Sequence, residues 1–320
     1  MNLDWVHWHP DPGVLDGLVV VSLLYAAAVG PLRRWIAPEE AFPRREACWF
    51  YGAVLVLFLA VGTPLDEIGE KYSFAAHMLQ HTLLIYPVPV MILLGTPAWI
   101  LRPLVSLEWS RPLFYFLTRP LVAALLFNVC LILWHLPGLY EWALRDPRIH
   151  FLEHASFIGV ALLAWWPAIP RLPEFPGLHP GPALLYLLPM GIAQSPLFAF
   201  LTFSGEVYYP TYASAPRLWN ITPIEDQILG GVLMKVVGMA VMFAAMAVAF
   251  YRWHSMEWRS ETLGPVPSAQ VRQQGVLSPG LGDQLVGVEN ALDEPDQAHG
   301  REEPQGGLAG RSPGHAPGQR

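Results

Sequence analysis

The chain has 320 residues, of which 53% are hydrophobic and only 14% are charged, with a formal net charge of −7. Soluble domains carry roughly 25% charged residues, so this composition argues against a soluble protein and predicts a membrane protein with no nucleic-acid partner. The two cysteines, Cys48 and Cys130, lie in different sequence environments, which argues against a disulfide and excludes a zinc site built on cysteines.

Seven apolar runs have the length of about 20 residues that crosses a bilayer as a helix. We therefore expect an all-α fold, a polytopic membrane protein with seven transmembrane helices. The third run contains Pro87 and Pro89, which predict a kink, and Pro97, which predicts its end. The predicted spans cover residues 14–36, 46–63, 74–101, 120–143, 149–168, 181–204 and 226–252.

The chain divides into three predicted segments. An extracytoplasmic N-terminal tail covers residues 1–13, and the transmembrane domain covers residues 14–258. Residues 259–320 are rich in Pro, Gly, Gln and acidic residues and have no apolar period, so we expect a disordered cytoplasmic tail.

The distribution of Lys and Arg predicts the orientation of these spans, because basic residues favour cytoplasmic loops. The N-terminal tail and the loops after the second, fourth and sixth spans contain only Lys71, Arg145, Arg148 and Arg217. The opposite side contains the larger set Arg33, Arg34, Arg44, Arg45, Arg102, Arg111, Arg119, Arg171, Arg252 and Arg259. The N-terminus is therefore predicted outside and the C-terminus in the cytoplasm.

Histidines gather near the outer ends of three predicted spans. Residues four apart share one face of a helix, so each of two histidine pairs can act as a clamp with two nitrogens. These pairs are His77 with His81 and His150 with His154. His135 lies late in the outward-running fourth span and reaches the same depth. Taken alone, His135 would be expected to bond to a neighbouring Ser, Tyr or carbonyl group.

Ionisable residues inside membrane spans tend to mark functional sites. Imidazole suits copper, zinc, iron and nickel, and copper is highest in the divalent affinity order. We therefore predict a site for one metal ion, or for two close ones. Glu153 and Asp226, near the outer ends of the fifth and seventh spans, are predicted to orient the imidazoles through hydrogen bonds to their outer ring nitrogens. The predicted ligands are His77, His81, His135, His150 and His154.

Two other functions fit parts of this pattern. Residues 150–154 read HFLEH, which matches the H-x-x-E-H pattern of zinc proteases with two His ligands and a Glu general base. A membrane zinc metalloprotease is therefore one alternative. A haem- or quinone-binding membrane electron carrier is the other, with His81 facing His154.

Lys235 lies deep in the last predicted span. A charge at the centre of a membrane helix costs about 2.5–3.5 kcal/mol on insertion scales, so this side chain needs a partner. We expect a structural ion pair with Glu225 or Asp226, and the alternatives are a role in a proton or anion path and a side chain that snorkels outward.

Three segments carry a family resemblance: "FAAHMLQHTLLIYPVPVMILLGTPAW", "WHLPGLYEWALRDPRIHFLEHASFIGVALLAWWP" and "VYYPTYASAPRLWNITPIEDQILGGVLMKVVG". Together, over roughly residues 15–255, they resemble the CtaG-type membrane proteins, which are assembly factors for caa-type cytochrome c oxidase in bacteria. Asp226 and Gln227 match the acidic patch of that family, whereas "DWVHWHPDPG" near the N-terminus falls outside the likeness. The positions that match its histidine motifs are His77, His81, His135, His150 and His154.

The resemblance implies a multi-pass protein of the bacterial cytoplasmic (inner) membrane that serves maturation of the respiratory oxidase. We expect a chaperone that binds copper or delivers it to the catalytic subunit of cytochrome c oxidase, and not an enzyme. A periplasmic or extracellular copper chaperone is the expected donor of the metal, and the lipid bilayer surrounds the protein.

Overall fold

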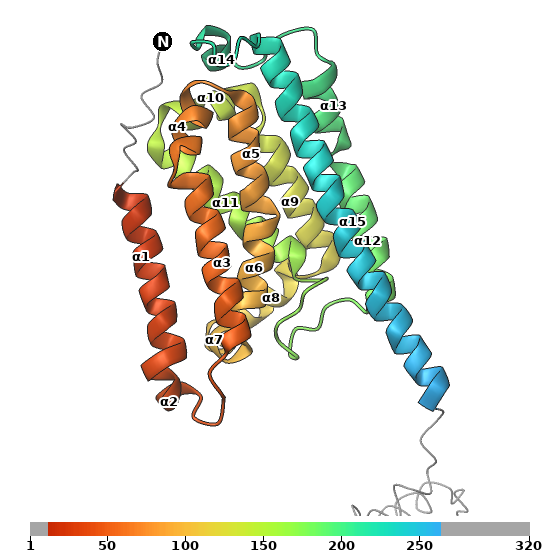
Figure 1. The fold of residues 1–320 in the computed structure, drawn as a ribbon. Coiled ribbons are helices and arrows are strands. Elements are labelled where there is room, and N and C mark those ends of the chain that lie inside the picture. Colours follow the sequence, from red (N-terminus) through yellow and green to blue (C-terminus); the bar gives the residue numbers. More distant parts are fainter. Residues whose placement is uncertain (1–11, 264–320) are drawn as a thin grey trace, which may run out of the picture. The chain divides into compact units, whose positions relative to one another are not determined.

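The computed structural model describes residues 12–263, with side chains up to residue 259, and these residues form helices joined by loops without any strand (Figure 1). His7, His9 and nearly all of the predicted C-terminal tail lie outside the described residues. The helices are α1 (Pro12–Ala27), η1 (Ala28–Leu32), α2 (Arg33–Ile36), α3 (Arg44–Val61), α4 (Pro64–Lys71), α5 (Phe74–Ile85), α6 (Pro87–Gly95), α7 (Ala98–Val105), α8 (Ser110–Leu117), α9 (Pro120–Trp134), α10 (Pro137–Arg145), α11 (Pro147–Trp165), α12 (Pro180–Ala193), α13 (Ser195–Phe203), α14 (Pro210–Ser214) and α15 (Pro223–Leu263).

Proline sets many of the helix starts. It lacks a backbone N–H and its fixed φ suits the first position of a helix, and it begins α4, α6, α9, α10, α11, α12, α14 and α15, among others. The third predicted span turns at Tyr86, directly before Pro87, as its prolines predicted. The single helix predicted over residues 120–143 is wrong, because Pro137 starts a separate helix and α9 ends at Trp134.

Four helical stretches of the described chain are long and apolar enough to cross a membrane, or up to six if each of two bent helix pairs counts as one span. The α11 helix, which contains Arg148, His150, Glu153 and His154, is not among them. The seven-span arrangement and the outward N-terminus therefore stay predictions. The four stretches are Pro12–Ile36, Phe74–Gly95, Pro180–Phe203 and Pro223–Arg259.

The bundle exposes many apolar side chains and also buries several polar side chains within its largely apolar core. Leu24 on α1 and Phe243 on α15 are more than half exposed, and similar residues cover both helices. Gln80, His81 and Glu153 are fully buried. An apolar exterior of this extent marks contact with a membrane, which supports the class predicted from composition.

Figure 1 shows α4, α10 and α14 at one end of the bundle and α2, α7 and α8 at the opposite end. The α11 helix packs against α5, α6 and α9, while α10 packs against α11 and α4 against α5. Phe74, Met78 and Phe157 belong to the hydrophobic core of these helices. The two helices that carry the histidine pairs therefore lie in contact at the bundle centre.

Close packing between α15 and α5 generates a stability prediction. A Cβ atom on Gly230 would lie 2.5 Å from a ring carbon of the buried Phe74, so we expect Gly230→Ala to lower the free energy of unfolding by about 1–3 kcal/mol. Gly159→Ala is the matched control, because nothing lies within 4 Å of its Cβ position and Ala favours the helix by about 1 kcal/mol. Thermal unfolding in detergent measures both, and equal midpoints would contradict the packing.

Candidate metal centre

The carboxylate of Asp226 fixes the start of α5, the helix that carries His77 and His81. Ser73 Oγ donates to Asp226 Oδ1 at 2.7 Å, and the backbone N–H groups of Phe74 and Ala75 donate to the two carboxylate oxygens at 2.6 and 3.2 Å. A negative group at a helix N-terminus accepts hydrogen bonds from free N–H donors and interacts favourably with the positive end of the helix dipole. Asp226 thus orients the histidine helix through its backbone rather than through a bond to an imidazole.

Both predicted histidine pairs share a face of their helix. The ring centroids of His77 and His81 on α5 are 4.3 Å apart, and those of His150 and His154 on α11 are 4.1 Å apart. The two pairs face each other, since the rings of His77 and His150 and those of His81 and His154 are each separated by 5.3 Å.

His135 joins this cluster from the end of α9. Its ring centroid lies 5.8 Å from that of His81, and its backbone forms the C-cap of α9. Tyr209 Oη donates to the carbonyl oxygen of His135 at 2.9 Å, which holds the helix end in place. All five predicted histidines are therefore buried in one cluster of side chains from three helices.

The ring of His77 has a defined proton position. Its Nδ1 atom lies 2.9 Å from Tyr212 Oη and 3.0 Å from Tyr140 Oη, and the two phenol oxygens lie 3.0 Å apart. Tyr212 donates its one proton to the carbonyl oxygen of Gly69 at 2.6 Å, so its oxygen accepts from the other two groups. We therefore assign the proton of His77 to Nδ1, which leaves Nε2 with a free lone pair.

The same reasoning assigns the proton positions on the rings of His135 and His150. His135 Nδ1 lies 2.7 Å from the carbonyl oxygen of Leu131, and His150 Nδ1 lies 2.7 Å from Glu70 Oε1. A carbonyl and a carboxylate only accept, so each Nδ1 atom carries the proton. Both Nε2 atoms then present lone pairs to the protein interior.

Burial also raises the pKa of the Tyr212 phenol, on the short helix α14, well above its usual value. The phenol therefore keeps its proton over the physiological pH range. This keeps the hydrogen bond to Gly69 intact and maintains the proton assignment of His77.

The cluster concentrates polar atoms that have no hydrogen-bond partner. Of the eleven such buried side-chain atoms found in the described residues, eight belong to the five histidines and Glu153. They include Nε2 of every histidine of the cluster and both carboxylate oxygens of Glu153. Each buried polar atom left unsatisfied costs about 1–3 kcal/mol, so the arrangement favours a ligand that binds lone pairs.

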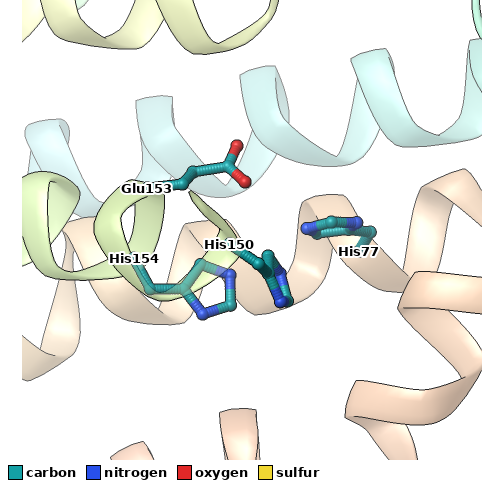
Figure 2. Close-up of side chains that lie close together, drawn as sticks. All are labelled: His77, His150, Glu153 and His154. Atoms are coloured by element: carbon teal, nitrogen blue, oxygen red, sulfur yellow. The ribbon is translucent and has the colours of Figure 1, made fainter. Parts of the chain in front are cut away.

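A cation is such a ligand. One ligand atom from each of His77, His150, Glu153 and His154 lies within 4.8 Å of the others. Figure 2 shows the three imidazoles gathered beside the turn of α11 that carries Glu153. Neutral imidazoles with one carboxylate suit copper, zinc or iron, so these residues fit a metal ion. Glu153, which was predicted to orient the imidazoles, contributes one of these candidate ligand atoms, and its role stays a prediction.

Glu70, Tyr140 and Tyr212 contact the predicted ligands and were missed by the sequence analysis. Nothing in the local sequence separates Glu70 from the other acids of α4. The contact arises because Gly69 packs against His77, where an added Cβ would lie 3.0 Å from the His77 Cα atom. Glu70 is the next residue of α4, and its carboxylate oxygen lies 2.7 Å from His150 Nδ1.

Neither alternative function is favoured by this geometry. The side chain of Glu153 is 0% exposed, with His81 Nε2 at 3.6 Å, so it has no access to a peptide as a protease base would need. The ring centroids of His81 and His154 are 5.3 Å apart, and the ring of His77 lies only 4.3 Å from that of His81. This crowding leaves no slot for a haem macrocycle between His81 and His154.

The predicted ion pair of Lys235 is wrong. Its Nζ atom donates to Ser195 Oγ at 2.7 Å and to the carbonyl oxygen of Gly191 at 3.4 Å, at the junction of α12 and α13. Glu225 and Asp226 lie more than two helical turns away along α15, and the described side chains include no ion pair between Lys235 and either acid. Lys235 therefore joins α15 to a broken helix, away from the histidines.

Comparisons with known proteins identify a family and several relatives. The family model described as cytochrome c oxidase caa3 assembly factor matches residues 23–255. Two similar relatives are "Uncharacterized protein Mb0105" of Mycobacterium bovis and "Uncharacterized protein MT0111" of Mycobacterium tuberculosis, each 27% identical over 271 residues. Each match covers 74% of this chain and 39% of the relative, so the chain spans about two fifths of their length. No solved structure matches.

The hydrogen bonds of Tyr212 generate a prediction for the site. Tyr212→Phe removes the donor to Gly69 and an acceptor for His77, so we expect the free energy of unfolding to fall by about 1–3 kcal/mol. Tyr115→Phe is the control, because this side chain is 55% exposed. Thermal unfolding in detergent compares the two variants, and an unchanged midpoint for Tyr212→Phe would contradict the stabilising role of these hydrogen bonds.

Proposed function

This chain belongs to the family of cytochrome c oxidase caa3 assembly factors, and we propose that it binds copper in the five-histidine cluster during assembly of the oxidase. The observation that carries the proposal is the set of Nε2 atoms without partners. At least three of them, those of His77, His135 and His150, are unprotonated by the assignment above. A ligand atom of His77 and one of His150 lie within 4.8 Å of a carboxylate oxygen of Glu153. A copper ion coordinates imidazole and satisfies these lone pairs together.

The surroundings of the cluster support exchange of the metal with another protein. The side chain of His150 is 10% exposed and that of Glu70 is 32% exposed, whereas Glu153 and His81 are fully buried. The access route therefore begins at Glu70, near the end of the bundle with α4 and α10 (Figure 1). The charge distribution predicts that this end faces outside, where a periplasmic or extracellular copper chaperone would supply the ion.

The recipient in this proposal is the catalytic subunit of cytochrome c oxidase, within the bacterial cytoplasmic membrane. Delivery requires release, and ligands on three separate helices allow the nitrogens to leave the ion one after another. The protein acts here as a copper-binding chaperone and not as a catalyst. A buried Glu153 without access for a second reactant supports that role.

Removal of the ligands tests the proposed function. We expect the double variant His77→Ala/His154→Ala to bind less copper than the wild type, measured as metal per purified chain, and to fail to restore oxidase activity in a deletion strain. His179→Ala is the control, since this exposed residue lies before α12, outside the cluster. Full copper content and full oxidase activity in the double variant would refute the proposal.

Glu70 provides a second, graded test. Its carboxylate accepts from His150 Nδ1, and loss of such a partner typically weakens metal binding 10- to 100-fold. We expect Glu70→Ala to weaken copper affinity by roughly this factor in a competition titration with a chelator. Glu67→Ala is the matched control on the same helix, because Glu67 pairs with the exposed Lys71. Equal affinities in the two variants would exclude a role for Glu70.

A further inference from the structure

We propose that the cluster holds two copper ions that share the carboxylate of Glu153. This inference rests on the proposed copper function, because it concerns the same side chains. The first position takes its imidazoles from His77, His150 and His154, and the second from His81 and His135.

The first position is complete without two of the histidines. Three imidazoles and one carboxylate oxygen already supply four ligand atoms within 4.8 Å of one another, which is the usual number for a tetrahedral ion. His81 and His135 do not belong to this group. Yet His81 has neither ring nitrogen bonded, and His135 Nε2 has no partner. One ion at the first position leaves these three nitrogens unsatisfied.

The contact between His81 and Glu153 has the separation expected of two ligands of one ion. His81 Nε2 lies 3.6 Å from Glu153 Oε1, which is too long for a hydrogen bond. Two ligand atoms bonded to the same metal at about 2.1 Å lie roughly 3–4 Å apart. Both oxygens of Glu153 lack a partner, so one carboxylate has the capacity to bind an ion on each side.

His135 completes the second position from another helix. Its proton is held on Nδ1 by the carbonyl of Leu131 at 2.7 Å, which directs the lone pair to Nε2. Its ring lies 5.8 Å from that of His81, and both rings lie near Phe157 at 6.2 and 4.8 Å. The inference therefore assigns two imidazoles and one carboxylate oxygen to the second position, with the ring of Phe157 beside both imidazoles.

The number of copper ions per chain tests the inference. The purified full-length chain in detergent is titrated with copper(I) under anaerobic conditions, and bound copper is counted after removal of the excess. We expect two ions in the wild type, one in His135→Asn, and one in His150→Ala. The asparagine amide retains a donor for Leu131 without the ligand nitrogen, which protects the fold. His179→Ala is the control and should retain two ions.

X-ray absorption tests independently whether two copper ions lie close together in one chain. Ions that share a carboxylate lie close together, about 3.5–4 Å in two-metal sites, so the wild type should show metal–metal scattering that His135→Asn lacks. One copper in the wild type that is unchanged in His135→Asn would overturn the two-ion inference and leave the proposed function standing. No bound copper in the wild type would overturn both.

Discussion

The interior of an apolar helix bundle offers no bulk water, so each buried polar group depends on a partner within the chain. Most of the described groups have one: Asp226 binds the start of α5, and Tyr86 donates to Gln194 at 2.8 Å. The histidine cluster is the main exception. Its unsatisfied atoms are mostly acceptors, which distinguishes a cation site from a set of ordinary interhelical hydrogen bonds.

The ring of contacts around the cluster explains why the lone pairs face inward. Glu70, the phenol of Tyr212 and the carbonyl of Leu131 each interact with an outer Nδ1 atom. A proton placed on Nδ1 cannot also occupy Nε2 in a neutral imidazole. The hydrogen bonds at the outer Nδ1 atoms therefore leave the inner Nε2 atoms unprotonated. In this way the outer partners determine which nitrogens can act as metal ligands.

Much of this site could be predicted from the sequence, because helical spacing and depth are local properties. The interval between His77 and His81, repeated at His150 and His154, places each pair on one helix face whatever the tertiary packing. The depth of His135 followed from its position in an apolar run, although Pro137 ends that helix earlier than predicted.

Other features depend on tertiary packing and have no local signal. The choice of Glu70 over the neighbouring acids comes from the close approach of Gly69 to His77. The contacts of Tyr212 with His77 join residues far apart in the chain, and Lys235 finds Ser195 only because two helices meet there. Periodicity gives the face that a residue occupies, but not its partner on the next helix.

The two histidine pairs have a mechanical consequence. Each pair is fixed on adjacent turns of a single helix, so neither can spread without unwinding its helix. The separation of α5 and α11 therefore determines two ring distances together. These are the distances from His77 to His150 and from His81 to His154, each 5.3 Å. A small displacement of one helix relative to the other would therefore lengthen the distance between the facing imidazoles at both levels together.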